Sequence, residues 1–133
     1  MVIGCFYTGS VRWKSLISRM DIERIRKYCL SLPHATEDIQ WENDLLFRIA
    51  GKMFAVVNLD SSPNHLFFKC NPEQFTELTQ IEGIIPAPYL ARHHWVSIQH
   101  HDAIRMDELQ ELIKNSYHLV LAKLPAGVRK KLI

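Results

Sequence analysis

The sequence has no long apolar segment, few cysteines and little net charge. Its apolar runs all stop well short of the ~20 residues that a helix needs to cross a bilayer. The apolar stretch Val2 to Tyr7 has neither a basic start before it nor a small-residue cleavage pattern after it, so we do not expect a secretory signal. Cys5, Cys29 and Cys70 are too scattered for a disulfide framework. These absences favour a cytoplasmic protein with reduced thiols and no membrane partner.

Motifs of the common catalytic and nucleotide-binding families are also missing. The chain contains no G-x-S-x-G, P-loop, G-x-G-x-x-G or H-E-x-x-H motif. Cys70 follows Lys69, whose charge would favour a reactive thiolate. No positioned base accompanies this pair, so a packed free thiol is the favoured interpretation. We therefore expect a protein that is not an enzyme and needs no cofactor.

The charges are few in total but unevenly distributed. A length of 133 residues, with 47% hydrophobic and 23% charged residues, is ordinary for one globular domain. The net charge of +2 does not by itself indicate a nucleic-acid-binding protein. However, residues 1–27 carry six basic and two acidic side chains, and the last eleven residues carry four basic ones and no acid. Residues 37–44 carry four acids and no base, which is typical of a solvated loop.

Helix signals occur at both ends of the chain and in its middle. Asp21 is a good N-cap for a first helix over residues 21–32, which Pro33 ends. Asn71, Pro72 and Gln74 have the spacing of a capping box with proline at the first helical position, which predicts a helix over 72–80. The apolar spacing predicts a long helix over residues 106–124. Pro125 should end this helix, and a basic tail should follow.

The segments between these helices have the pattern of β-strands. Ile39 and Trp41 alternate with polar residues, and two apolar runs flank Gly51-Lys52, where glycine allows a tight hairpin turn. The predicted strands are 45–50, 53–59, 65–69 and two within 84–99. The order is helix, three strands, helix, two strands, helix. Because hairpins dominate, we expect an α+β fold of two layers, with helices on one face of an antiparallel sheet. Residues 20–133 would form this single domain, and residues 1–19 an N-terminal extension.

The segment from Pro86 to Ile98 combines rigid backbone, cations and aromatic side chains. Two prolines fix the backbone before Tyr89, and Arg92, His93 and His94 lead into a strand that starts at Trp95. Tryptophan is more often a core residue than a stacking surface, so we favour burial of Trp95. Arg92 is a better candidate for contact with phosphate.

The histidine pairs 93–94 and 100–101 suggest a metal site at first sight. Neighbours on a strand point to opposite faces, and same-face histidines six residues apart lie about 20 Å from one another. This separation is too large for one ion, so we predict no metal site.

Five short segments, in the same order, resemble the MmcQ/YjbR family over about residues 20–133. They are Tyr28-Cys-Leu-Ser-Leu-Pro33, Gly51-Lys-Met-Phe-Ala55, Lys69-Cys-Asn-Pro-Glu73, Tyr89-Leu-Ala-Arg-His-His-Trp95 and Ser116-Tyr117. The resemblance implies an α+β domain similar to frataxin (CyaY-like) proteins, described for this family as a double-wing DNA-binding fold. Where the family usually has a polar residue two places before His93, this chain has Ala91, so a hydrogen bond from that position cannot form.

A frataxin-like iron role would need a ridge of carboxylates on the first helix and the adjoining strand. That helix is basic here, with only Asp21 and Glu23 acidic, so we do not expect iron binding.

Two functions remain open after these exclusions. The first is a non-catalytic DNA-binding module that contacts the phosphate backbone with little base specificity, because no helix carries the pattern that reads base edges. Its predicted nucleic-acid-binding residues are Lys52, Lys69, Arg92, His93, His94 and Trp95. The alternative is a protein- or peptide-binding adaptor that docks its partner on an exposed sheet face or edge.

Overall fold

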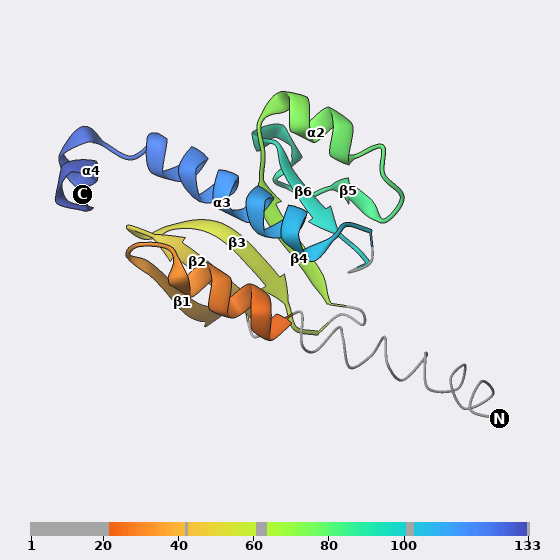
Figure 1. Ribbon diagram of the computed structural model, residues 1–133, viewed down its shortest axis with the longest axis horizontal. Helices are drawn as coiled ribbons and strands as arrows, with labels where there is room; N and C mark the ends of the chain where they lie inside the picture. Colours follow the sequence, from red (N-terminus) through yellow and green to blue (C-terminus); the bar gives the residue numbers. More distant parts are fainter. Residues whose placement is uncertain (1–21, 42, 61–63, 101–102, 133) are drawn as a thin grey trace.

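The protein forms one antiparallel sheet with helices packed on it. The computed structural model describes residues 22–41, 43–60, 64–100 and 103–132. The strands follow the order β1-β2-β3-β4-β6-β5 (Figure 1). They are β1 (Ala35–Gln40), β2 (Asp44–Ile49), β3 (Lys52–Asn58), β4 (His65–Lys69), β5 (Ile84–Pro86) and β6 (Trp95–Ile98). The helices are the first helix at residues 22–31, α2 (Pro72–Leu78), the 3-10 turn η1 (Ala91–His93), α3 (Met106–Ala122) and α4 (Ala126–Leu132).

The predicted α+β class with an antiparallel sheet is confirmed. The structure contains two elements that the predicted order lacks. β1 is an additional strand at one edge of the sheet, and α4 is a helix where a basic tail was expected. Pro125 follows the end of α3, as predicted. The Pro125 carbonyl accepts hydrogen bonds from the backbone N–H groups of Val128 and Arg129, and these bonds begin α4. The expected extension 1–19, the N-cap Asp21 and His101 lie outside the described residues.

The hairpin between β2 and β3 turns one residue earlier than predicted. Ile49 pairs with Lys52, so Ala50 and Gly51 are the central residues of the turn. Their φ values are +51° and +80°, and two-residue hairpins of type I′ need positive φ at both positions. Lys52 is thereby the first residue of β3 and not part of the turn.

The start of α2 agrees with its sequence signal. The Asn71 side chain accepts a hydrogen bond from the backbone N–H of Gln74 (N···O 2.7 Å), and the Gln74 side chain accepts one from the backbone N–H of Asn71 (3.3 Å). Pro72 occupies the start of the helix, where a missing N–H costs nothing. This reciprocal cap fixes the direction in which β4 leads into α2.

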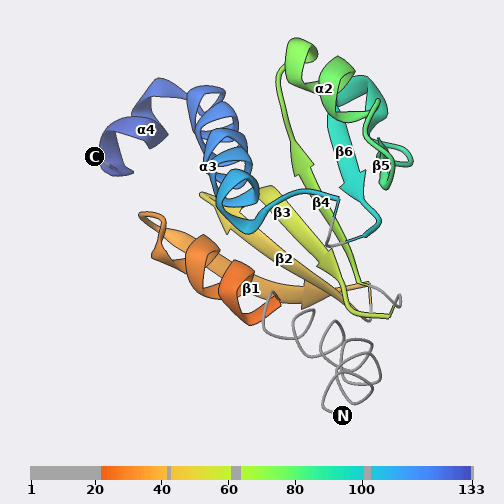
Figure 2. The ribbon, with the colours of Figure 1, turned by 45° about the vertical axis from the view of Figure 1, so that its right-hand side comes forward.

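The main core lies between the helices and one face of the sheet. Figures 1 and 2 show the first helix and α3 lying across that face. Phe47, Phe54 and Phe68 of neighbouring strands are fully buried against Ile113 and Tyr117 of α3. This arrangement leaves the opposite sheet face without a helix layer in the described part of the chain.

A smaller core forms on that opposite face. Leu46 and Trp95 alternate along their strands with residues of the main core, so they point the other way. The connection between β5 and β6 folds over them and contributes Ala87 and Leu90. The segment from Pro86 to Ile98, which combines prolines, cations and aromatic residues, therefore packs across the second face of the sheet.

Three acids of the segment 37–44 lie in strands and not in a solvated loop, so that prediction was wrong for them: Glu37 and Asp38 in β1, and Asp44 in β2. Glu37 and Asp38 each have a cationic neighbour. The Arg26 guanidinium donates two short hydrogen bonds to Glu37 (2.7 and 2.8 Å), and Arg48 Nε donates to Asp38 (3.1 Å). These pairs attach the edge strand to the first helix and to β2.

Candidate nucleic-acid interface

Three lysines and a histidine surround one cavity of about 470 Å³ at one end of the central strands of the sheet. Lys52 begins β3 and Lys69 ends β4, and these strands are antiparallel, so the two residues lie at the same end of the sheet. His93 closes η1 and Lys123 follows the last residue of α3. The other described residues that line it are Met53, Trp95, Val120, Leu124 and Pro125, and none of these carries a carboxylate.

Lys69 and Lys123 line the same cavity, and the charge of Lys123 acts on Lys69. Burial lowers the pKa of Lys69, and the hydrogen-bond contact and positive charge of Lys123 lower it further. Two like charges this close repel one another unless an anion lies between them. The cavity therefore has the electrostatic character of an anion site.

The backbone of Lys69 is fixed from beneath by α3. Its N–H donates to the Ser116 hydroxyl oxygen (N···O 3.0 Å), and that hydroxyl donates to the Phe54 carbonyl (2.6 Å). Ser116 is fully buried, so this contact is shielded from water. The contact ties β3, β4 and α3 together next to the cavity.

The structure brings together four of the six residues predicted to bind nucleic acid: Lys52, Lys69, His93 and Trp95. Arg92 is exposed on η1 beside His93 but does not line the cavity. His94 was expected on a strand when the metal site was considered, but it lies outside β6. It caps η1 with a φ of +64°, and its ring contacts Phe75 of α2 edge-on at 5.4 Å.

Trp95 borders the cavity but is only 5% exposed. It pairs with Lys69 across β4 and β6 and packs with Leu46, Val56 and Ala87. This burial agrees with the core interpretation and leaves no face of the indole open for a stacked base.

Two other aromatic side chains are exposed on the second sheet face. Trp41 is 67% exposed and Tyr89 is 99% exposed. Both border an apolar groove of about 420 Å³ that also contains Pro88 and Leu90. Met53 lines this groove and the basic cavity, so the two sites adjoin.

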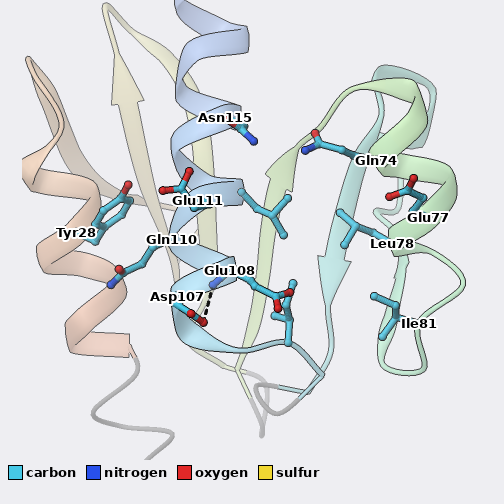
Figure 3. A pocket seen from close by; sticks show the side chains of 12 residues that line it. Tyr28, Gln74, Glu77, Leu78, Ile81, Asp107, Glu108, Gln110, Glu111 and Asn115 are labelled. Carbon is cyan, nitrogen blue, oxygen red and sulfur yellow. Dashed lines mark hydrogen bonds between the residues drawn. The ribbon is translucent and has the colours of Figure 1, made fainter.

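A larger cavity lies elsewhere and has the opposite charge. Figure 3 shows this space of about 700 Å³ between α2 and α3, where Glu77, Asp107, Glu108 and Glu111 line it. Burial and the nearby Glu111 raise the pKa of Tyr28 at its margin. Because these four carboxylates have no lysine or arginine beside them among the described lining residues, they would repel phosphate.

The described residues contain no group of three histidine, cysteine or acidic side chains that could hold a metal ion. Cys70 is 2% exposed, its thiol donates to the His94 carbonyl (3.3 Å), and burial raises its pKa to about 11. This is the packed thiol favoured from the sequence. No helix in the described ranges is long and apolar enough to cross a membrane.

A family model described as YjbR matches residues 30–119. The chain belongs to the YjbR family. The match covers most of the described elements, from the first helix to α3, and confirms the resemblance read from the sequence. YjbR is not known as a family of enzymes.

Solved structures agree with the YjbR assignment. The Deinococcus radiodurans protein DR2400, described by the domain DUF419 of the same family, is 29% identical. The similarity covers 84% of this chain and 86% of that one, with a TM-score of 0.76. A Pseudomonas syringae protein with 20% identity shares the fold over 73% of this chain and 96% of its own, with a TM-score of 0.60. No curated protein is significantly similar to the chain.

The basic cavity and the apolar groove include three residues that were not among the predicted nucleic-acid-binding residues: Lys123, Trp41 and Tyr89. Lys123 was noted only as part of a basic end, because its closeness to Lys69 depends on how α3 crosses the sheet. Trp41 was assigned to an alternating strand pattern, but it follows β1 with a φ of +49°. The acidic and polar residues around Trp41 in the sequence could have indicated that its side chain is exposed.

Proposed function

We propose that this YjbR protein is a non-catalytic nucleic-acid-binding module that holds backbone phosphates at the cavity lined by Lys52, Lys69 and Lys123. The gathering of Lys52, Lys69 and Lys123 around one cavity carries this proposal. A phosphate placed between Lys69 and Lys123 would replace repulsion with two charge-assisted hydrogen bonds.

The position of the basic groups supports phosphate binding over base reading. The lysines lie at strand and helix ends, and His93 and Arg92 are on a short 3-10 turn. No helix among the described residues presents a row of arginine, asparagine or glutamine side chains of the kind that reads the major groove. Binding through such groups is largely independent of sequence.

A salt-dependent titration with labelled duplex DNA tests the proposal. If roughly three to five phosphates are neutralised, log K should fall against log salt with a slope of about −3 to −4.5. Arg92→Glu, Lys52→Glu and Lys123→Glu should each reduce the magnitude of that slope by about one and weaken binding to all sequences alike.

Lys114→Glu is the matched control, because Lys114 is an exposed lysine of α3 that borders a different cavity. It should leave the slope nearly unchanged. Undetectable binding at low salt, or binding indifferent to both salt and the cavity lysines, would overturn the proposal. In that case the adaptor function, with apolar docking that salt does not weaken, becomes the better explanation.

A further inference from the structure

We infer that the nucleic acid is single-stranded and that its bases stack on Trp41 and Tyr89 in the apolar groove beside the basic cavity. This inference rests on the proposed function, because the phosphates are assigned to the lysine cavity. It adds a second part of the site, on the sheet face opposite α3.

The exposure of these two aromatic side chains is the first observation. Trp41 is 67% exposed and Tyr89 is 99% exposed, although large aromatic residues gain stability from burial. Both also have left-handed backbone conformations, with φ of +49° and +66°. Such conformations are unfavourable for bulky residues and concentrate at functional sites. Two rings are thus presented to solvent from constrained backbone positions.

The groove between the rings has the right surface for a base. Val56, Phe67, Pro88 and Leu90 give it apolar walls, and its volume is about 420 Å³. Nucleobases stack on aromatic side chains through faces that every base possesses. In a duplex these faces are covered by neighbouring base pairs, so only an unpaired strand presents them to the groove.

The charges along the surface orient such a strand. At the groove end, the Asp44 carboxylate accepts a hydrogen bond from the Asn58 side chain (3.0 Å) and would repel phosphates. At the other end, Lys52, Lys69 and Lys123 attract phosphates. The uncharged bases therefore belong at the aromatic end and the phosphates at the basic end.

The two ends are joined by one strand of the sheet. Asp44 pairs with Asn58 at the end of β3, Lys52 begins β3, and Met53 lines both spaces. Six steps of a strand cover about 20 Å. At the stacked spacing of about 3.4 Å, this length corresponds to roughly six nucleotides. A short oligonucleotide thus reaches both parts of the site.

Binding of three labelled ligands of equal length tests this inference: an oligo-dT of about 12 nucleotides, an abasic strand with the same phosphates, and a duplex. Wild-type protein should bind oligo-dT about tenfold or more tightly than the abasic strand, since each stacked base contributes substantially. Trp41→Ala and Tyr89→Ala should remove that preference and leave affinity for the abasic strand and the duplex unchanged. Trp41→Phe should retain most of it, because phenylalanine still stacks.

Ile81→Ala is the control, because Ile81 is an exposed apolar residue that borders the acidic cavity instead. It should change none of the three affinities. Lys123→Glu should weaken all three ligands in parallel, because it removes a phosphate contact and not a stacking contact.

The outcomes separate the two proposals. The stacking inference is overturned if oligo-dT and the abasic strand bind equally well and Trp41→Ala and Tyr89→Ala change neither affinity. If Lys123→Glu still weakens binding in that case, the proposed phosphate binding remains supported. Thymidine monophosphate binding as tightly as oligo-dT would overturn the assignment to a strand. Failure of all three ligands at low salt overturns the proposed function itself.

Discussion

The hydroxyl of Ser116 in α3 accepts a hydrogen bond from the backbone N–H of Lys69 in β4, with an N···O distance of 3.0 Å. The same hydroxyl donates to the carbonyl of Phe54 in β3 at 2.6 Å. One buried oxygen thus satisfies polar groups of two neighbouring strands. It also fixes the backbone from which the Lys69 side chain reaches the basic cavity.

Ser116→Ala should lower the free energy of unfolding by about 1–3 kcal/mol, because two buried backbone groups would lose their partner. Urea denaturation at neutral pH measures this loss. Ser31→Ala is the control, because Ser31 is exposed near the end of the first helix and should change stability by no more than about 0.5 kcal/mol. Equal effects of the two substitutions would contradict the bridging role of Ser116.

Trp95→Ala should lower the free energy of unfolding by about 3–5 kcal/mol, since it leaves a large cavity in the smaller core. Tyr89→Ala provides the comparison within the same segment, because a side chain that is 99% exposed contributes little to packing. Thermal and urea unfolding of the two variants should differ clearly. A Trp95→Ala variant as stable as the wild type would mean that the indole is not a core residue.

Lys123→Gln should slightly stabilise the free protein, by a few tenths of a kcal/mol within the roughly 0.5 kcal/mol typical of surface substitutions. The physical reason is that it removes the positive charge that lowers the pKa of Lys69. The same change should weaken anion binding. We would measure urea unfolding with and without added inorganic phosphate: phosphate should stabilise the wild type more than Lys123→Gln. An equal phosphate effect on both proteins would exclude Lys123 as an anion ligand.

The Lys69 ammonium also predicts a pH dependence. Its folded pKa lies below its unfolded pKa, so between these values the unfolded state binds more protons and stability rises with pH. In Lys123→Gln the two pKa values should be closer, so this rise should be smaller. The range to compare lies just below the unfolded lysine pKa of about 10.4, where the two proteins differ in titrating groups only at Lys123.

Cys29 should produce the opposite alkaline effect. Burial raises the pKa of its thiol to about 12, whereas an unfolded cysteine has a pKa of about 8.5. Its contribution to stability is therefore complete below about pH 8.5 and is lost progressively as pH rises toward 12, by at most about 1.4 kcal/mol per pH unit. Cys29→Ala should be less stable at neutral pH but lose stability less steeply between pH 8 and pH 10, the range to measure.

Cys70, Tyr28 and Tyr117 also have pKa values raised by burial and are present in both proteins, so only the difference between the two slopes reports on Cys29. Identical slopes for wild type and Cys29→Ala would contradict a deeply buried thiol at this position.

Local signals in the sequence determined most of the elements of this YjbR domain. The capping box of Asn71 and Gln74, the apolar spacing of the long helix and the glycine between β2 and β3 each act within a few residues, so they could be read directly. Local signals failed where a partner was distant. The acids of β1 were assigned to a loop because Arg26 and Arg48, which pair with them, come from other elements.

The candidate site depends on tertiary structure for the same reason. Lys52, Lys69 and His93 were selected from the sequence, but only the crossing of α3 brings Lys123 to Lys69 and leaves Ser116 beneath them. Trp95 and Tyr89 belong to one aromatic and basic segment, yet one is buried and the other fully exposed. Residue type sets the chemistry that a side chain can offer. Its exposure and its charged neighbours are set by packing between segments that are far apart in the chain.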